Sequence, residues 1–75
     1  MDKAATDHVL TIVRLLAKGA DDRRLAPAQV NILNQNVETL IKYDTDNFVR
    51  EFLGRVKDAH GVLTPNVSGK LAGYP

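Results

Sequence analysis

Three consecutive stretches of this 75-residue chain each repeat apolar residues at the spacing of an α-helix, and each is followed by a signal that ends one. Apolar residues three or four positions apart lie on one side of a helix, which must be buried against something. The pattern therefore predicts an all-α fold. We expect a small three-helix bundle over residues 1–61, with residues 62–75 as an ordered C-terminal arm or a short fourth helix, packed on the bundle or on a partner.

The length of the chain limits how the protein can be stabilised. A chain of 75 residues forms one domain, and a core of that size contributes only a few kcal/mol of net stability. Small proteins make up the difference with disulfides, a metal, close helix packing or self-association. This chain has no cysteine and only two histidines, so packing and self-association remain and we expect a homodimer.

The first helix is predicted from about Thr6 to Lys18, with Thr6 or Asp7 as its N-cap and Gly19 as its stop. The charged segment that follows, residues 20–25, is expected to be a solvated loop. The predicted buried face of the helix contains Val9, Ile12, Val13 and Leu16.

Leu10 and Leu15 flank this predicted face on opposite sides. At about 100° per residue, the apolar arc then covers more than half of the helix surface. A single neighbouring helix cannot cover so wide an arc. The first helix is therefore expected to be either central in the bundle or shared with a partner.

The second helix is predicted from Pro27, which suits the first turn of a helix, to Lys42. Its predicted buried stripe contains Val30, Leu33, Val37, Leu40 and Ile41. The residues off this stripe are Asn31, Ile32, Asn34, Gln35, Asn36, Thr39 and Tyr43. Asparagine is a mediocre helix former, so this side is either sequence drift on a solvated face or a contact surface with Ile32 and Tyr43 as apolar anchors. Together with Leu10 and Leu15, these residues are the predicted partner-binding site.

The third helix is predicted from about Asp46 to His60, with Asp44 or Thr45 as its cap. Gly54 lies in its middle, so either another backbone approaches closely there or glycine is simply tolerated. The predicted apolar face contains Phe48, Val49, Phe52, Val56 and Ala59, with Leu53 at its edge.

Gly61 is expected to end the third helix, and residues 62–75 differ in kind from the rest. Thr64 and Pro65 are typical of an N-cap and a first helical residue, which predicts a short helix from Pro65 to Leu71. The apolar residues of this segment are expected to fold back over the bundle or to reach another chain, and the last few residues to fray unless a partner holds them.

Groups suited to catalysis or metal binding are sparse. His8 and His60 are far apart in the sequence, each without a second histidine or a cysteine nearby, and are interpreted as surface or capping residues. The adjacent Asp21 and Asp22 lie in a predicted loop, and no spacing gives Ser68 a histidine and an acid. We therefore expect no enzymatic activity, no cofactor, no metal and no small-molecule substrate.

The alternative function is a small nucleic-acid-binding regulator that uses the second or the third helix. The N-terminal end of a recognition helix meets the bases, but here Asp44 and Asp46 would face phosphates. The basic residues of the third helix alternate with acidic ones, and the net charge of +1 gives no global attraction to a polyanion. The amides of the second helix are able to read adenine, but that helix has little positive charge. Nucleic acid is thus the less favoured partner.

The expected function is a small non-catalytic protein–protein interaction module that associates with itself. It would act as an adaptor, or as an inhibitor that blocks the working surface of a larger protein. Stand-alone proteins of this size and composition are often accessory factors of phages or mobile elements. No apolar run approaches the roughly 18 residues that span a bilayer, so no membrane contact and a cytoplasmic location are expected.

Overall fold

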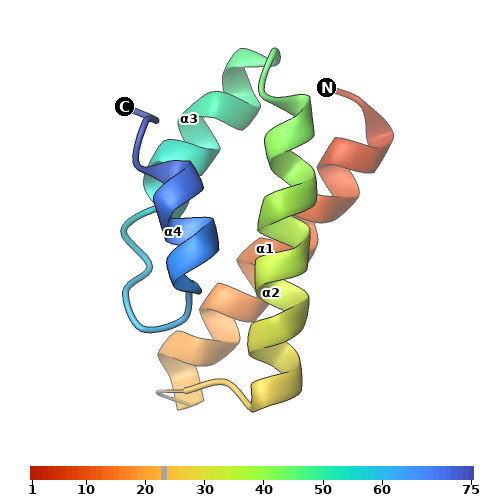
Figure 1. Ribbon diagram of the computed structural model, residues 1–75. Coiled ribbons are helices and arrows are strands. Elements are labelled where there is room, and N and C mark those ends of the chain that lie inside the picture. Colours follow the sequence, from red (N-terminus) through yellow and green to blue (C-terminus); the bar gives the residue numbers. More distant parts are fainter. Residues whose placement is uncertain (23) are drawn as a thin grey trace.

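The computed structural model describes residues 1–22 and 24–75, and only the backbone at residues 21 and 22. Within this part, the chain forms four α-helices and one 3-10 turn: α1 (Lys3–Asp22), α2 (Pro27–Leu40), η1 (Ile41–Tyr43), α3 (Asn47–Val56) and α4 (Pro65–Leu71). The all-α fold and the short fourth helix are thus confirmed. α1 packs mainly against α2, while α4 packs against α2 and α3 (Figure 1).

α1 is longer than predicted at both ends. Asp2, and neither Thr6 nor Asp7, caps its start: the Asp2 carboxylate accepts from the backbone N–H of Ala4 at 2.7 Å. The Asp2 carbonyl accepts from the Thr6 N–H at 2.9 Å, so Thr6 is already inside the helix.

The prediction that Gly19 ends α1 is also wrong, because the helix continues to Asp22. A β-carbon at residue 19 would lie 3.3 Å from the Leu25 side chain, so the returning chain packs closely over this glycine. The predicted loop therefore starts later than residue 20, and Arg23 lies outside the described residues.

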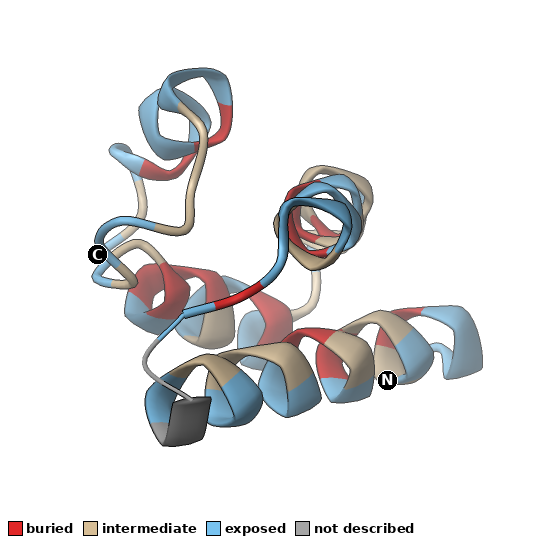
Figure 2. Cartoon of the chain, turned by 90° about the horizontal axis from the view of Figure 1, so that it is seen from below, coloured by how far each residue is buried: buried red, intermediate tan, exposed pale blue. Residues whose placement is uncertain are grey.

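The core contains residues from all four helices, whose buried stripes face one another (Figure 2). Three predicted core residues are not in it: Val13 is 46% exposed, Phe48 is 55% exposed, and Ala59 is half-buried beyond the end of α3. Ala5 is buried because α1 starts before the predicted residue and continues the stripe of Val9 and Ile12 by one turn, and Leu53, predicted at the edge of the face of α3, is fully buried. The largest fully buried side chains are Ile12, Leu33, Val37, Leu40, Val49, Leu53 and Leu71.

α3 begins and ends close to, but not at, the predicted residues. Asp46 is the N-cap, in place of Asp44 or Thr45, and its carboxylate accepts from the backbone N–H groups of Phe48 and Val49 at 2.8 and 3.3 Å. The helix ends at Val56 and not at residue 60, since the N–H groups of Asp58 and Ala59 bond three residues back and no longer four. The chain then turns toward α4, and Gly61 adopts a left-handed φ of 87° that favours glycine.

The C-terminal arm folds back over the bundle. The Thr64 hydroxyl caps α4 by accepting from the Val67 N–H at 3.2 Å, as predicted. Beyond α4, the Tyr74 hydroxyl donates to the Asp44 carboxylate at 2.6 Å, and the Lys57 ammonium donates to the Tyr74 carbonyl. These contacts hold the last residues on α3 without a partner chain.

The same arm explains Gly54. A β-carbon at this position would collide with the main-chain oxygen of Pro75. Of the two interpretations of this glycine, the close approach of another backbone is therefore the correct one. Burial raises the pKa of Tyr74 in this arm to about 12, and its hydrogen bond to Asp44 acts in the same direction.

Candidate functional site

The outer side of α2 presents an apolar side chain among uncharged amides. Ile32 is 46% exposed, and Asn31 and Gln35 beside it are also exposed. This arrangement follows from the spacing of residues around the helix. The side of α2 that contains Leu33 and Val37 faces the core, so Ile32 lies off that side and is exposed to solvent. We call Asn31, Ile32 and Gln35 the α2 face.

The α2 face contains no charge of its own. Glu38 is the single charged residue of α2; it follows Gln35 by one turn on the same side of the helix, and it is paired with α4. The Lys70 ammonium of α4 lies 2.9 Å from the Glu38 carboxylate, and the Asn66 amide donates to the same oxygen at 3.1 Å. The hydrogen bond from Lys70 lowers the pKa of Glu38.

Asn36 and Tyr43 tie α2 to α1. The Asn36 amide nitrogen donates to the Ile32 carbonyl at 2.8 Å, which leaves its oxygen to accept from His8 Nδ1 at 2.7 Å. The rings of His8 and Tyr43 lie with their centroids 6.4 Å apart, and Tyr43 packs against the core. Thr39 is half-buried. These three predicted site residues thus form the border of the α2 face toward α1.

Asn34 was predicted on the exposed surface, and this is wrong. It is buried, and its amide nitrogen donates to the carbonyls of Val30 and Val62 at 2.8 Å each. Its oxygen accepts from the Thr64 N–H at 2.8 Å. Asn34 therefore joins α2 to the start of α4. The available signal was its position one turn after Val30, at the edge of the buried stripe.

The two leucines of the predicted site lie elsewhere. His8 marks the side of α1 that touches α2, and Leu10 lies about 200° around the helix from it. Leu10 is 45% exposed, whereas Leu15 is half-buried and packs against the core. The structure thus places the predicted site residues in several separate locations, of which only the α2 face is a continuous exposed surface.

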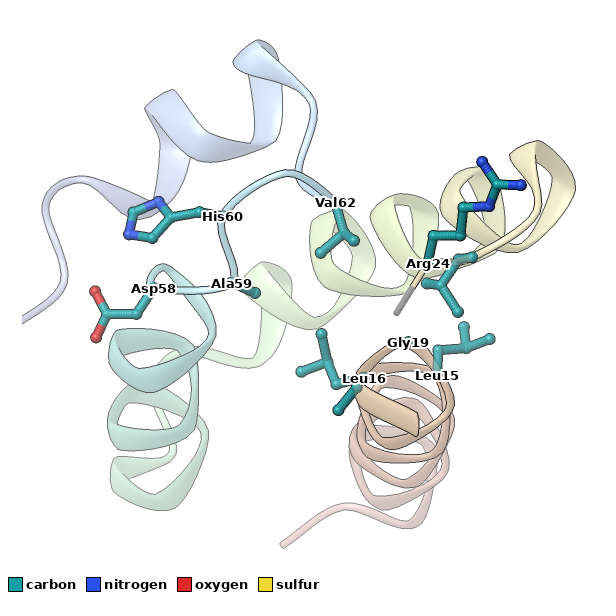
Figure 3. Close-up of a pocket in the computed structure, with 10 residues that line it drawn as sticks. Leu15, Leu16, Gly19, Arg24, Asp58, Ala59, His60 and Val62 are labelled. Atoms are coloured by element: carbon teal, nitrogen blue, oxygen red, sulfur yellow. The ribbon is translucent and has the colours of Figure 1, made fainter. Parts of the chain in front are cut away.

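A shallow groove of about 470 Å³ lies between the C-terminal half of α1 and the segment before α4. Leu16 and Val62 point toward each other across it (Figure 3). Asp58 and His60 project on one side of the groove, and Arg24 lies on the opposite side. The titratable groups therefore do not converge on one point, as an acid, a base and a nucleophile would have to do.

The geometry of α3 does not favour a nucleic-acid interface. The carboxylate of Asp46 is at the N-terminal end of the helix, and Asp44 lies just before it. Glu51 is exposed between the exposed Arg50 and Arg55. Phosphates approaching this helix would meet acidic groups as well as basic ones.

No three or more His, Cys, Asp and Glu side chains come together as a metal site in the part of the chain that the structure describes. None of its described helices has the length and apolarity to cross a bilayer. Comparison with protein-family models, with curated proteins and with solved structures gives no match.

Proposed function

We propose that this chain is a non-catalytic protein-interaction module that binds another protein through the α2 face. The observation that carries the proposal is the half-exposed Ile32 on a helix whose single charge is already paired. The centres of protein interfaces are depleted in charged residues, because each buried charge must be desolvated. An exposed surface of a small protein has no such need to avoid charge.

The chemistry of the α2 face indicates the kind of partner. Ile32 would fill an apolar pocket, and the amides of Asn31 and Gln35 would donate and accept hydrogen bonds around it. These two amides suit backbone N–H and C=O groups or uncharged polar side chains. Binding through this face would therefore depend little on salt concentration.

An adaptor or an inhibitor would both use this face. For an inhibitor, one rigid apolar anchor is enough to occupy the working surface of a larger protein. The α2 face suits this role, because the bond between Asn36 and His8 and the core packing of Leu33 and Val37 hold α2 in place. A preorganised surface binds with a smaller loss of conformational entropy.

The test is capture of a binding protein from the lysate of the source cells with the wild-type chain, Ile32→Asp and Phe48→Asp. Ile32→Asp places a charge at the centre of the face and should abolish capture. Phe48→Asp is the matched control, since this more exposed aromatic side chain lies on α3 and should leave capture unchanged. The free energy of unfolding of both variants should lie within about 0.5 kcal/mol of the wild-type value, because both positions are exposed. Equal capture by all three chains, or none by wild type, would refute the proposal.

A further inference from the structure

α1 has two apolar stripes that run side by side along the helix. The buried stripe contains Ala5, Val9, Ile12, Leu16 and Gly19. The second, which we call the outer stripe, has the same steps of four and three residues and contains Thr6, Leu10, Val13, Ala17 and Ala20. Leu10 is 45% and Val13 46% exposed, and both alanines are exposed. Alternating steps of three and four are the spacing by which one helix pairs with another.

We propose that the outer stripe binds the outer stripe of a second copy of this chain, with the two α1 helices antiparallel about a two-fold axis. This goes beyond the proposed function, because it uses another face and another partner. In this pairing Leu10 contacts the partner's Val13, and Val13 contacts the partner's Leu10. A self-complementary stripe of this kind forms a closed dimer and leaves no open end.

Side-chain size supports the antiparallel direction. The large residues of the outer stripe are Leu10 and Val13 at its centre, and the small ones are toward its C-terminal end. In the antiparallel pair, Ala17 contacts the partner's Thr6, so this small side chain meets a larger one. The contact then stays close over several turns of helix.

Charge also selects this direction. Asp7 and Arg14 are exposed, and each directly follows a residue of the outer stripe, on the edge away from the core. The antiparallel pair places Asp7 near the partner's Arg14 and Arg14 near the partner's Asp7, which gives two symmetric ion pairs. A parallel pair would place this charged edge against the buried edge of the partner's helix. The existing contact from Lys3 to Asp7, at 3.6 Å between exposed side chains, is weak enough to coexist with the new pair.

The first test is the mass of the full chain in solution over a concentration series, by light scattering after size exclusion. Wild type should be a dimer, and Leu10→Asp should raise the dissociation constant at least about a hundredfold, since it buries two negative charges, one from each copy, at the centre of the contact. The variants Phe48→Asp and Ile32→Asp change apolar residues outside the outer stripe that are at least as exposed as Leu10, and both should remain dimeric. A wild-type monomer at millimolar concentration, or a dimer that resists Leu10→Asp, would overturn the proposal.

A charge exchange tests the contact without changing the apolar stripe. Arg14→Asp should weaken the dimer about tenfold, because two ion pairs become two repulsions. Adding Asp7→Arg to it restores opposite charges and should recover the wild-type dissociation constant. Both side chains are exposed, so folding is preserved and is checked by circular dichroism. Failure of the double variant to recover would exclude the antiparallel register.

Direction is tested by disulfide formation, for which the absence of cysteine in the chain gives a clean background. Chains with Thr6→Cys and chains with Ala17→Cys are mixed and oxidised. The antiparallel pair forms the mixed disulfide, whereas a parallel pair would join like with like. Because Ile32→Asp and Leu10→Asp act on different faces, loss of partner capture and loss of the dimer are separate results. Either proposal can therefore fail without the other.

Discussion

Replacement of Gly54 by alanine tests whether the last residues of the chain are part of the fold. At an open position inside a helix, this change stabilises a protein by up to about 1 kcal/mol. At residue 54, however, the new methyl group would collide with the main-chain oxygen of Pro75. A backbone oxygen cannot move aside as the end of a flexible side chain can, so Pro75 must move off α3, and we expect the adjoining Tyr74 to move with it.

The magnitude follows from what that movement breaks. The hydrogen bond from Tyr74 to Asp44 and the one from Lys57 to the Tyr74 carbonyl are both lost, and each involves a charged group. At these partly exposed positions we assign about 1 kcal/mol to each, below the range for fully buried examples. Exposure of the Tyr74 ring adds about 1 kcal/mol. Against the gain in helix propensity, Gly54→Ala should thus lower the free energy of unfolding by about 2 kcal/mol, or the melting temperature by about 10 °C.

The assay is urea and thermal unfolding followed by circular dichroism, with Gly69→Ala as the matched control. A β-carbon at Gly69 would meet nothing within 4 Å, so this helical substitution should stabilise the protein. The decisive background is a chain that ends at residue 71. In that shortened chain Pro75 is absent, so the effect of Gly54→Ala on the free energy of unfolding should change sign, and the substitution should stabilise the protein by about 1 kcal/mol. If Gly54→Ala stabilises the full chain as Gly69→Ala does, the docking of the arm on α3 is refuted.

Three further predictions address the buried amide, the arm and the alternative function. Asn34→Ala should cost about 3 kcal/mol in unfolding experiments, since it leaves the start of α4 without its partners, whereas the exposed Asn31→Ala should change stability by less than about 0.5 kcal/mol. Tyr74 has a raised pKa of about 12 in the fold, so its contribution is complete below pH 10 and is lost as the pH rises toward 12. The difference in unfolding free energy between wild type and Tyr74→Phe should therefore shrink over that interval. Duplex DNA titrated at 50 mM salt should show no binding in fluorescence anisotropy, and binding that weakens steeply with salt would instead support the nucleic-acid alternative.

Helix boundaries could be predicted where one local signal has no competitor. Pro27 and Pro65 fix the starts of α2 and α4, because proline suits the first turn and little else in a helix. The start of α1 was missed because Asp2, Thr6 and Asp7 are all able to cap a helix, and the choice among them depends on where the buried stripe begins. Its end was missed because Gly19 is typical of a helix stop, whereas here it lies inside the helix and leaves room for the Leu25 side chain of the following segment.

In the candidate site, too, local sequence predicts some features, whereas others depend on tertiary packing. Helical phase correctly predicts that Ile32 lies off the buried stripe, since this depends on α2 alone. Helical phase cannot tell which asparagine is exposed, because that depends on the side of α2 against which the C-terminal arm packs. The arm returns over Asn34, which becomes a structural bridge, and leaves Asn31 in solvent. Sequence composition treats the two residues alike, and only the tertiary packing separates them.

The structure shows which part of the wide apolar arc on α1 is covered by the core and which part is exposed. Leu15, one of the two flanking leucines, is partly covered by the protein's own core. The excess that remains is on the other flank, where Leu10 and Val13 are adjacent on one face, and single exposed apolar residues would need no such explanation. Pairing of that flank in a dimer would leave the α2 face free, since the two lie on different sides of the helix pair. The dimer would then present two α2 faces at once, and a partner with two sites would bind it more tightly than either face binds alone.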